Sequence, residues 1–528
     1  VIVRDPVVMV ATLPRFLNIG DNSRFAIDIN NVEGEAGTYK LSLSSTGPVA
    51  IPANQRERSL QLAKGARQSL SVPISGASVG IATIEARLTG PGFDGPQTFR
   101  IGVQPGRPPL INRTVRPLAA QASVRLTPDL FADLLPGTGL ASISVSPMTA
   151  LDVPALLASL DRFPYGCTEQ TVSRALPLLY VNALSAVNAL PTDTNLDERI
   201  RTSIERVLAR QDSNGSFGLW SVGGDDIWLD AYVTDFLTRA REGGFVVPQI
   251  GFDLALDRLR NFVANQDFTK GSGEDLAYAV YVLARNGRPV MGDLRYLADV
   301  RIKDFGSPLA QSQIAAALAL LGDRGRAQAA FTTAVSALGA AVDKPVSRPD
   351  YGSRLRDGAA VLTLAAEAGA QAADITAVGR VVEDARSRRS YTSTQEEAWM
   401  VLAAEALTKR AEGIRVTVNG TPHAGALYRN LRADALGGAG FTVANAGSTP
   451  LQMVVSVAGN PLTPEPAASR GYSIARNYYK LDGTQVDPAH VNQNDRLVVT
   501  LKVTETEAAF ARLLLVDYLP AGFEIDNP

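Results

Sequence analysis

The side chains with the clearest capacity for chemistry are Cys167 and Gln170, which lie three positions apart. They belong to the segment Phe163-Pro164-Tyr165-Gly166-Cys167-Thr168-Glu169-Gln170, and Cys167 is the only cysteine of the chain. If a helix begins here, positions i and i+3 share a face, so the thiol reaches the side-chain carbonyl of Gln170. Attack of the thiol on that carbonyl with loss of ammonia would close an internal thioester, which acylates any nucleophile that reaches it.

The neighbouring residues fit such a bond. Pro164 and Gly166 shape a tight entry into the helix, and glycine permits backbone angles that other residues avoid. Glu169 either holds the loop or orients the amide. The rings of Phe163 and Tyr165 would keep water away from the thioester carbonyl. A lone buried cysteine is more often a small hydrophobic residue, so the short Cys-x-Glu-Gln pattern depends on its eight-residue context.

Composition limits the classes of function. With 528 residues the chain should form several domains. A formal net charge of −2 gives no argument for nucleic acid or an anionic membrane as partner. One cysteine excludes an internal disulfide framework and a cysteine-rich metal site, and no cofactor is implied. No apolar run could span a bilayer and no signal peptide opens the chain. Because both ends look cut, at Val1 and Pro528, we expect a fragment of a larger protein.

The first hundred residues alternate apolar and polar side chains between turn-forming clusters, which predicts a β-sandwich. The clearest runs are Arg24–Asn30, Tyr39–Ser44, Ser69–Ile74, Ile81–Leu88 and Thr98–Val103. A linker follows at Pro105–Pro109. Residues 110–148 are strand-like again, in particular Ala122–Leu126 and Ala141–Ser146, but they are too few for a core of their own.

From about residue 149 to 412 the apolar spacing becomes helical. It begins at Leu156, Leu157 and Leu160 and continues through Ile227–Leu237, Asp275–Leu283, Gln311–Leu321, Asp357–Ala368 and Glu396–Leu407. Helices with a recurring Ala/Leu/Tyr face predict an α/α toroid, in which each helix pair buries its face against its neighbours. Trp220, Trp228 and Trp399 are interpreted as core residues. The loops Gly215–Gly218 and Gly223–Gly224 either line the thioester site or serve as simple turns.

Strand patterns return after the helices, at Ile414–Gly420, Phe441–Val443 and Leu451–Val457. We expect them to pair with the strands of 110–148, so that the helical domain is an insertion in a β-sandwich. After a proline-rich link at Pro461–Pro466, a further β domain should begin near Gly471 and include Arg496–Val503 and Arg512–Leu519.

The segment Phe163–Thr171 with the following Ala175–Tyr180 resembles the bacterial α2-macroglobulins, relatives of animal α2-macroglobulin and the complement thioester proteins. Val3–Pro6 and Asn31–Gly34 look like the family's preceding macroglobulin-type domain. The resemblance implies four parts: residues 1–106 as a macroglobulin-type β-sandwich, 107–148 with 413–462 as a split CUB-like domain, 149–412 as the α/α-toroid thioester domain, and 463–528 as the start of a truncated macroglobulin-type domain. Phe163 stands where many bacterial members have Tyr, so it lacks the hydroxyl.

The same resemblance implies a broad-spectrum protease trap rather than an enzyme. In the family a protease cuts a bait region, which would lie upstream of this chain, and the exposed thioester of Cys167 and Gln170 then acylates a lysine amine of that protease in a single turnover. The implied partners are host or competitor proteases and the peptidoglycan-synthesis machinery, without nucleic acid, cofactor or metal. The implied protein is monomeric, periplasmic and anchored by lipid to the inner membrane.

The two histidines suggest which nucleophiles would react. Some complement relatives use a histidine of the thioester domain to form an acyl-imidazole that passes the acyl group to hydroxyls. Here His423 and His490 both lie outside the predicted helical domain. We therefore predict direct attack by amines and poor transfer to sugars.

Three other classes remain open from the residues. A cysteine hydrolase would need a histidine beside Cys167, and neither histidine is in the same domain. An α/α-toroid glycosidase or terpene cyclase would need paired carboxylates, but adjacent acids such as Asp225-Asp226 and Glu396-Glu397 do not share a helix face and are more often caps or surface. A thioester adhesin anchors cells to surfaces through the same bond. Only the family resemblance distinguishes a protease trap from this class.

Overall fold

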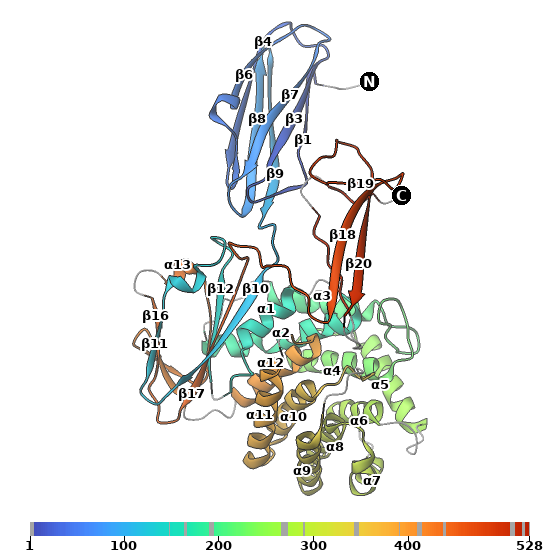
Figure 1. Cartoon of the computed structure of the whole chain (residues 1–528). Helices are drawn as coiled ribbons and strands as arrows, with labels where there is room; N and C mark the ends of the chain where they lie inside the picture. The colour runs from blue at the N-terminus through green and yellow to red at the C-terminus, as the bar shows by residue number, and fades with distance from the viewer. Residues whose placement is uncertain are drawn as a thin grey trace. The chain divides into compact units, whose positions relative to one another are not determined.

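The structure is a computed structural model that describes residues 5–146, 148–162, 166–188, 195–265, 273–288, 291–342, 348–389, 391–408, 414–436, 440–506, 513–519 and 523–526. Figure 1 labels the helices and strands in chain order. The chain divides into two compact units. The first comprises Val1–Ile111, Phe131–Gly139 and Ala458–Pro528, and the second comprises Asn112–Leu130 and Leu140–Val457. Across the described ranges, no helix is both long and apolar enough to cross a membrane.

The first unit opens with a β-sandwich. One sheet has the order β1-β3-β7-β5 and the other β2-β9-β8-β4-β6. Alternate residues point inward, as at Phe25, Ile27 and Ile29, which are fully or almost fully buried, so the alternation in the sequence correctly predicted these strands. The strands are β1 Val7–Thr12, β2 Phe16–Asn18, β3 Asn22–Asn31, β4 Gly37–Thr46, β5 Val49–Ala50, β6 Glu57–Leu62, β7 Arg67–Gly76, β8 Gly80–Gly90 and β9 Phe93–Gln104.

A third sheet of this unit has the order β19-β18-β20, built from β18 Tyr472–Lys480, β19 Gln485–Val486 and β20 Leu497–Glu505. The predicted strand at Arg496–Val503 is present as β20. The prediction of a strand at Arg512–Leu519 is wrong, because the described residues 513–519 are irregular and Leu513 and Leu514 are exposed. A strand needs a partner for its backbone N–H and C=O groups, and the described strands of this sheet offer that run no pairing.

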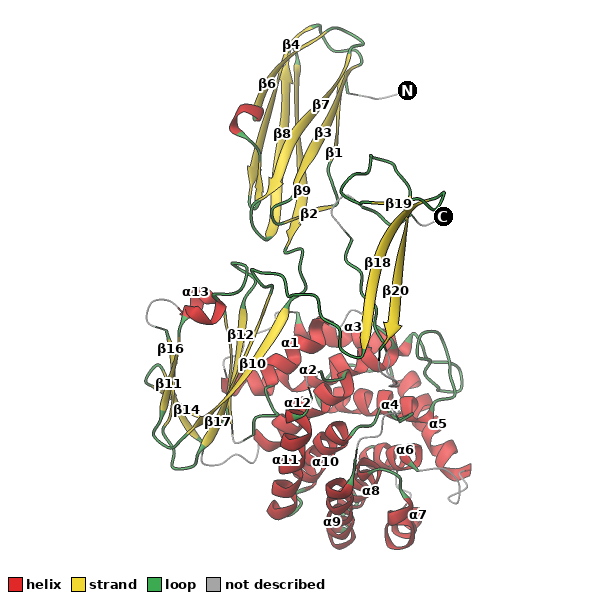
Figure 2. Ribbon diagram, viewed as in Figure 1, coloured by secondary structure: helices red, strands yellow, loops and turns green. Residues whose placement is uncertain are grey.

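The second unit contains two further sheets, β10-β17-β12-β15 and β11-β16-β13-β14. Their strands come from both sides of the helical block, and they pair across it: Ile143 lies opposite Arg429, and Val124 lies opposite Val443. The expected pairing is thus confirmed, and the helices are inserted within a β-sandwich (Figure 2). The elements are β10 Leu110–Leu118, β11 Ser123–Leu126, β12 Leu140–Ser146, β13 Arg415–Val418, β14 Thr421–Ala424, β15 Leu427–Leu431, α13 Ala433–Leu436, β16 Phe441–Asn445 and β17 Leu451–Gly459.

The helices form a closed ring. The even-numbered helices are successive neighbours from α2 to α12, and α12 packs back against α2. The intervening helices pack outside them, so the architecture is the predicted α/α toroid. The helices are α1 Val153–Arg162, α2 Thr168–Asn188, α3 Leu196–Leu208, α4 Ile227–Glu242, α5 Gln249–Asn265, α6 Glu274–Arg285, α7 Met291–Tyr296, α8 Pro308–Leu320, α9 Arg324–Ala340, α10 Arg354–Ala368, α11 Ala372–Ser387 and α12 Thr394–Thr408.

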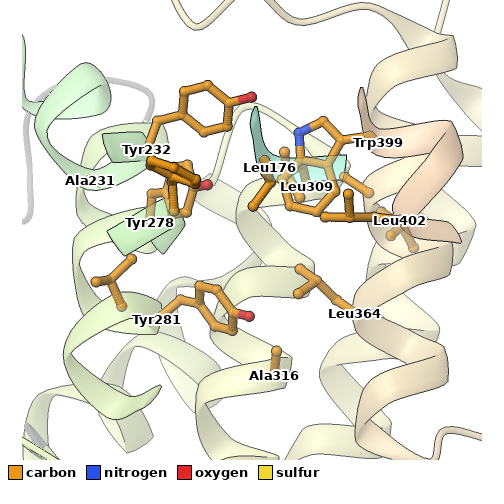
Figure 3. Close-up of a cluster of buried hydrophobic side chains, with 14 of the residues drawn as sticks. Leu176, Ala231, Tyr232, Tyr278, Tyr281, Leu309, Ala316, Leu364, Trp399 and Leu402 are labelled. Atoms are coloured by element: carbon orange, nitrogen blue, oxygen red, sulfur yellow. The ribbon is translucent and has the colours of Figure 1, made fainter. Parts of the chain in front are cut away.

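The inner helices are buried on nearly every side, as expected for helices enclosed by others. On α4 every residue from Ile227 to Ala240 is buried. Figure 3 shows side chains from several inner helices converging, including Tyr232 of α4, Tyr278 of α6 and Trp399 of α12. The prediction that Trp228 and Trp399 are core residues is confirmed, whereas Trp220 is 62% exposed.

An ion network ties four inner helices together. The guanidinium of Arg239 on α4 is fully buried and pairs with Asp235 at 3.0 Å and with Glu367 on α10 at 2.8 Å. It also donates to the hydroxyls of Tyr180 on α2, at 2.9 Å, and Tyr281 on α6, at 3.0 Å. The four acceptors lie on four different inner helices. The buried guanidinium of Arg239 therefore fixes how these helices pack against one another.

Replacing Arg239 by Met should therefore lower the free energy of unfolding by about 3–5 kcal/mol, since Asp235 is left buried without its partner. Urea unfolding followed by far-ultraviolet circular dichroism measures the change. Arg326→Met is the control, because it removes an exposed pair with Asp299 and should shift the midpoint little. Equal midpoints for Arg239→Met and Arg326→Met would contradict the assignment.

Candidate functional site

Cys167 and Gln170 form a reciprocal pair of hydrogen bonds at the start of α2. The backbone N–H of Gln170 donates to Sγ of Cys167 at 3.4 Å, and the backbone N–H of Cys167 donates to Oε1 of Gln170 at 3.2 Å. The carbonyl of Cys167 accepts the first helical hydrogen bond, from Thr171. This is the capping-box arrangement, in which the cap side chain and the side chain three residues later each satisfy the other's backbone N–H.

The start of α12 carries the same arrangement in its ordinary form. There the backbone N–H of Ser393 donates to Glu396 at 2.8 Å, and the N–H of Glu396 donates to Oγ of Ser393 at 3.3 Å. Serine and carboxylate have no reason to condense, whereas a thiol held beside a carboxamide can displace ammonia from it. The position of Cys167 and Gln170 thus follows from helix capping, and their side-chain chemistry sets this cap apart.

The thiol lies in a sheltered position. Cys167 is 5% exposed, and burial, the largest effect, raises the pKa of its thiol above the usual range. The backbone N–H groups of Gln170 and Glu169 and the charge of Arg210 act in the opposite direction. The N–H groups belong to the first turn of α2, where the helix dipole favours negative charge. Burial therefore favours the neutral thiol before any reaction. The N–H groups at the start of α2 can stabilise the negative charge when the sulfur becomes a thiolate.

Glu169 is buried, at 3% exposure, and joins the two ends of the ring. Its Oε1 accepts from Ser173 at 2.6 Å, from Gln395 at 2.9 Å and from Thr394 at 3.1 Å. Ser173 lies on α2, and Thr394 and Gln395 open α12. These contacts join α2 to α12. Among the described residues, none joins the Glu169 carboxylate to the loop before α2 or to the Gln170 amide, so both roles considered for Glu169 stay predictions.

Arg210 supports the turn that precedes α2, and nothing in the sequence pointed to it. Its Nη2 donates to the carbonyl of Gly166 at 2.9 Å, and its Nη1 donates to Oγ1 of Thr168 at 3.0 Å and to the carbonyl of Leu219 at 3.3 Å. Arg210 lies two residues after α3, and the packing of α3 against α2 brings it beside the start of α2.

The loop between α3 and α4 borders the site. The N–H of Thr168 donates to Leu219 at 2.9 Å, and its hydroxyl donates to Gly218 at 2.6 Å. Gly218 has no room for a side chain, because a Cβ there would lie 1.9 Å from the carbonyl oxygen of Ser221. Of the two roles considered for the glycine loops, lining the site is thus supported for Gly218. Trp220 lies on the same loop, and its side chain is exposed. The prediction that Trp220 is a core residue is therefore wrong.

The remaining predicted residues fall into three groups. Gly166 accepts from Arg210 as described, whereas Phe163, Pro164 and Tyr165 lie outside the described residues. His423 lies on β14 of the β-sandwich and contacts the carbonyl of Ala426 at 3.2 Å, and His490 belongs to the other unit. Within the described part of the chain, no group of three or more His, Cys, Asp or Glu side chains is placed to hold a metal ion.

The paired acids have structural partners. Asp226 caps α4 by accepting from the N–H of Leu229 at 3.0 Å. This agrees with the prediction that such adjacent acids are more often helix caps or surface residues. Glu396 and Glu397 are buried rather than surface residues. Glu396 accepts from Ser353 at 2.5 Å. Glu397 accepts from Ser159 at 2.7 Å and from Thr392 at 2.7 Å. Burial raises the pKa of Glu397 to about 7, so this helix junction holds a carboxyl that is not fully ionised at neutral pH.

Comparison with known proteins agrees with this architecture. Residues 142–272 match the family model of the A-macroglobulin TED domain, and residues 471–528 match that of the bacterial alpha-2-macroglobulin MG10 domain. The alpha-2-macroglobulin of Escherichia coli strain K12 is 30% identical over the whole of this chain, which corresponds to 33% of that protein. The chain therefore spans about a third of the length of the curated relatives it matches.

Solved structures give the same result. A crystal structure of Salmonella alpha-2-macroglobulin reacted with methylamine has a TM-score of 0.80 and 30% identity, covering 96% of this chain and 34% of that one. Native Escherichia coli alpha-2-macroglobulin from domain MG7 to the C-terminus has a TM-score of 0.80 and 26% identity, covering 95% of this chain and 81% of that one. Macroglobulin-type sheets with one helical TED domain thus define a multidomain protein of the macroglobulin class. The chain belongs to the bacterial alpha-2-macroglobulin family.

The contacts of Glu169 generate a test of its role. Glu169→Met should lower the free energy of unfolding by at least about 2 kcal/mol, because buried donors of Ser173, Thr394 and Gln395 lose their acceptor. Glu169→Gln is the matched control, since its Oε1 can still accept all three bonds and the loss should be smaller. The urea midpoints of the two variants decide the matter, and a Met variant as stable as the Gln variant would count against this role.

Proposed function

We propose that Cys167 and Gln170 close an internal thioester and that this chain is the acylating part of a protease trap. The thiol would add to Cδ of Gln170 and expel ammonia, which leaves Sγ bonded to that carbon. A lysine amine of a protease would later attack the same carbon. The new amide would then join the two proteins, and Cys167 would leave as a thiol.

One observation carries this proposal: the reciprocal bonds at the start of α2 hold the side chains of Cys167 and Gln170 on each other's backbone N–H groups, with Cys167 buried and Gln170 half-buried. The sequence motif alone left open whether the cysteine is only a small hydrophobic residue. A packing role would not require a carboxamide at the third position of the helix. The Salmonella relative that was crystallised after reaction with methylamine adds support by showing that a similar protein is treated with small amines.

The target class follows from the surroundings of the sulfur. The described hydrogen bonds of the Cys167 and Gln170 side chains go to each other's backbone N–H groups, without an imidazole. An acyl-imidazole intermediate has no group to form on, so we propose direct transfer to amines. The trap would be a single-turnover inhibitor of endopeptidases, and its periplasmic, lipid-anchored location rests on the family resemblance.

The domain limits are also a proposal. The residue ranges 1–106, 107–148 with 413–462, 149–412 and 463–528 are supported by the irregular links between β9 and β10 and between β17 and β18. Independent folding of the helical range would be the direct test of these limits.

Intact-mass spectrometry tests the thioester. The purified chain should weigh less than its sequence by one ammonia, and methylamine should convert it to the sequence mass plus methylamine minus ammonia. Cys167→Ala should show neither change, and Cys167→Ser serves as a second control of similar size. A wild-type chain at its plain sequence mass, with a Cys167 that iodoacetamide alkylates freely, would refute the thioester.

Conjugation tests the trap. Joined to its upstream bait region, the chain should form an amide-linked conjugate with trypsin that withstands denaturation, and pretreatment with methylamine should prevent it. Trypsin whose lysines are reductively dimethylated is the matched control, because tertiary amines cannot yield an amide. Conjugation of the dimethylated protease to the same extent would contradict lysine as the target.

The absence of an imidazole near the described site leads to a competition experiment. Glycerol or glucose in large excess should leave the yield of methylamine adduct nearly unchanged, since a hydroxyl needs a general base to attack at neutral pH. Adduct masses report both products in one sample. Substantial glycerol ester in the presence of methylamine would show that the site transfers to hydroxyls after all.

A further inference from the structure

The peptide bond between Gly166 and Cys167 is engaged at both ends. Its carbonyl oxygen accepts from Nη2 of Arg210 at 2.9 Å. Its N–H donates to Oε1 of Gln170 at 3.2 Å. A guanidinium, one peptide unit and the carboxamide oxygen are thus connected in a single line of hydrogen bonds.

The guanidinium in this line is held in place from several sides. Its side-chain partners, Gly166, Thr168 and Leu219, all offer neutral oxygens. The carbonyl of Arg210 accepts from Gly218 at 3.1 Å and from Gly223 at 3.0 Å, which fixes its backbone. With neutral partners, the positive charge remains available to polarise the peptide bond that it contacts.

Polarisation passes along such a line. A cation at the carbonyl oxygen draws electrons from the peptide nitrogen, so the N–H becomes a stronger donor. The oxygen that receives this N–H is the one that becomes negative when an amine adds to the acyl carbon of Gln170. A donor fixed at that oxygen before reaction lowers the barrier, as in the oxyanion holes of acyl-transfer enzymes.

We propose that the Cys167 N–H is the oxyanion donor of the acyl-transfer step and that Arg210 is a positioning residue that strengthens it through the Gly166–Cys167 peptide. This inference rests on the proposed thioester. An amine nitrogen adds to Cδ of Gln170, and the carbonyl electron pair moves onto Oε1 against the N–H. The pair then returns, the C–S bond breaks, and the proton lost by the amine to solvent is matched by one that the thiolate of Cys167 gains.

The rate of methylamine addition tests the inference. Arg210→Met removes the cation and its donors while keeping an unbranched side chain, and it should slow the second-order reaction at least about tenfold, less than the hundredfold or more that loss of a direct oxyanion donor costs. Arg210→Lys keeps the charge and should lose less than Met does. Arg201→Met is the matched control, since Arg201 is an exposed arginine in the middle of α3, and this variant should react at the wild-type rate.

The infrared stretching frequency of the thioester carbonyl separates polarisation from mere support. A hydrogen bond to the oxygen lowers this frequency, so it should rise in Arg210→Met and stay unchanged in Arg201→Met. Unfolding midpoints show whether each variant is folded. If Arg210→Met fails to fold or to form the thioester, Arg210→Lys supplies the comparison. A raised carbonyl frequency with slower addition than in Arg201→Met then supports the role of the guanidinium, and wild-type values of both quantities overturn it.

The outcomes distinguish the two proposals. A wild-type chain without the ammonia deficit refutes the thioester itself. A wild-type chain with the deficit, together with an Arg210→Met variant that reacts at the wild-type rate with an unshifted carbonyl frequency, overturns the role of Arg210 and leaves the thioester standing.

Discussion

The site depends on a local constraint that is common in proteins, namely that the first N–H groups of a helix have no partner within the helix. At α2 these groups are satisfied by Sγ of Cys167 and Oε1 of Gln170 in reciprocal bonds. Capping thus brings a nucleophilic sulfur to an acyl carbon without a dedicated binding pocket. Everything else at the site, including the contacts of Glu169 and Arg210, holds this short stretch of backbone in the place where it begins its helix.

The closed ring provides that support. Because α12 packs against α2, Glu169 can accept hydrogen bonds from Thr394 and Gln395 more than two hundred positions later in the chain. Acids gather near the starts of inner helices, as at Glu169, Asp226 and Glu396, whereas Arg239 and Arg285 lie near helix ends. This distribution complements the helix dipoles. The ring therefore has a polarity of its own, and the sulfur lies at the end where negative charge is stabilised.

The sequence predicted much of this correctly, and the reasons are local. Alternation at Phe25, Ile27 and Ile29 identified β3, and the helical spacing after Ile227 identified α4. The Cys-x-Glu-Gln spacing pointed to the two residues that form reciprocal side chain–backbone hydrogen bonds. What failed or was missed depends on tertiary contacts. Leu513–Leu515 are apolar enough for a strand but have no described partner strand, and Trp220 is exposed on a loop held by Thr168. Arg210, Thr394 and Gln395 belong to no recognisable motif. The packing of α3 on α2 brings Arg210 to the site, and the packing of α12 on α2 brings Thr394 and Gln395.

The capping arrangement also decides what remains after the proposed reaction. An amide formed on Gln170 still has a carbonyl oxygen for the N–H of Cys167, and the released thiol can again accept from the N–H of Gln170. The start of α2 would therefore have the same hydrogen bonds before the thioester forms and after an amine has opened it. A spent molecule keeps its fold although it has lost its reactivity, so it would remain a stable carrier of the protein it has captured.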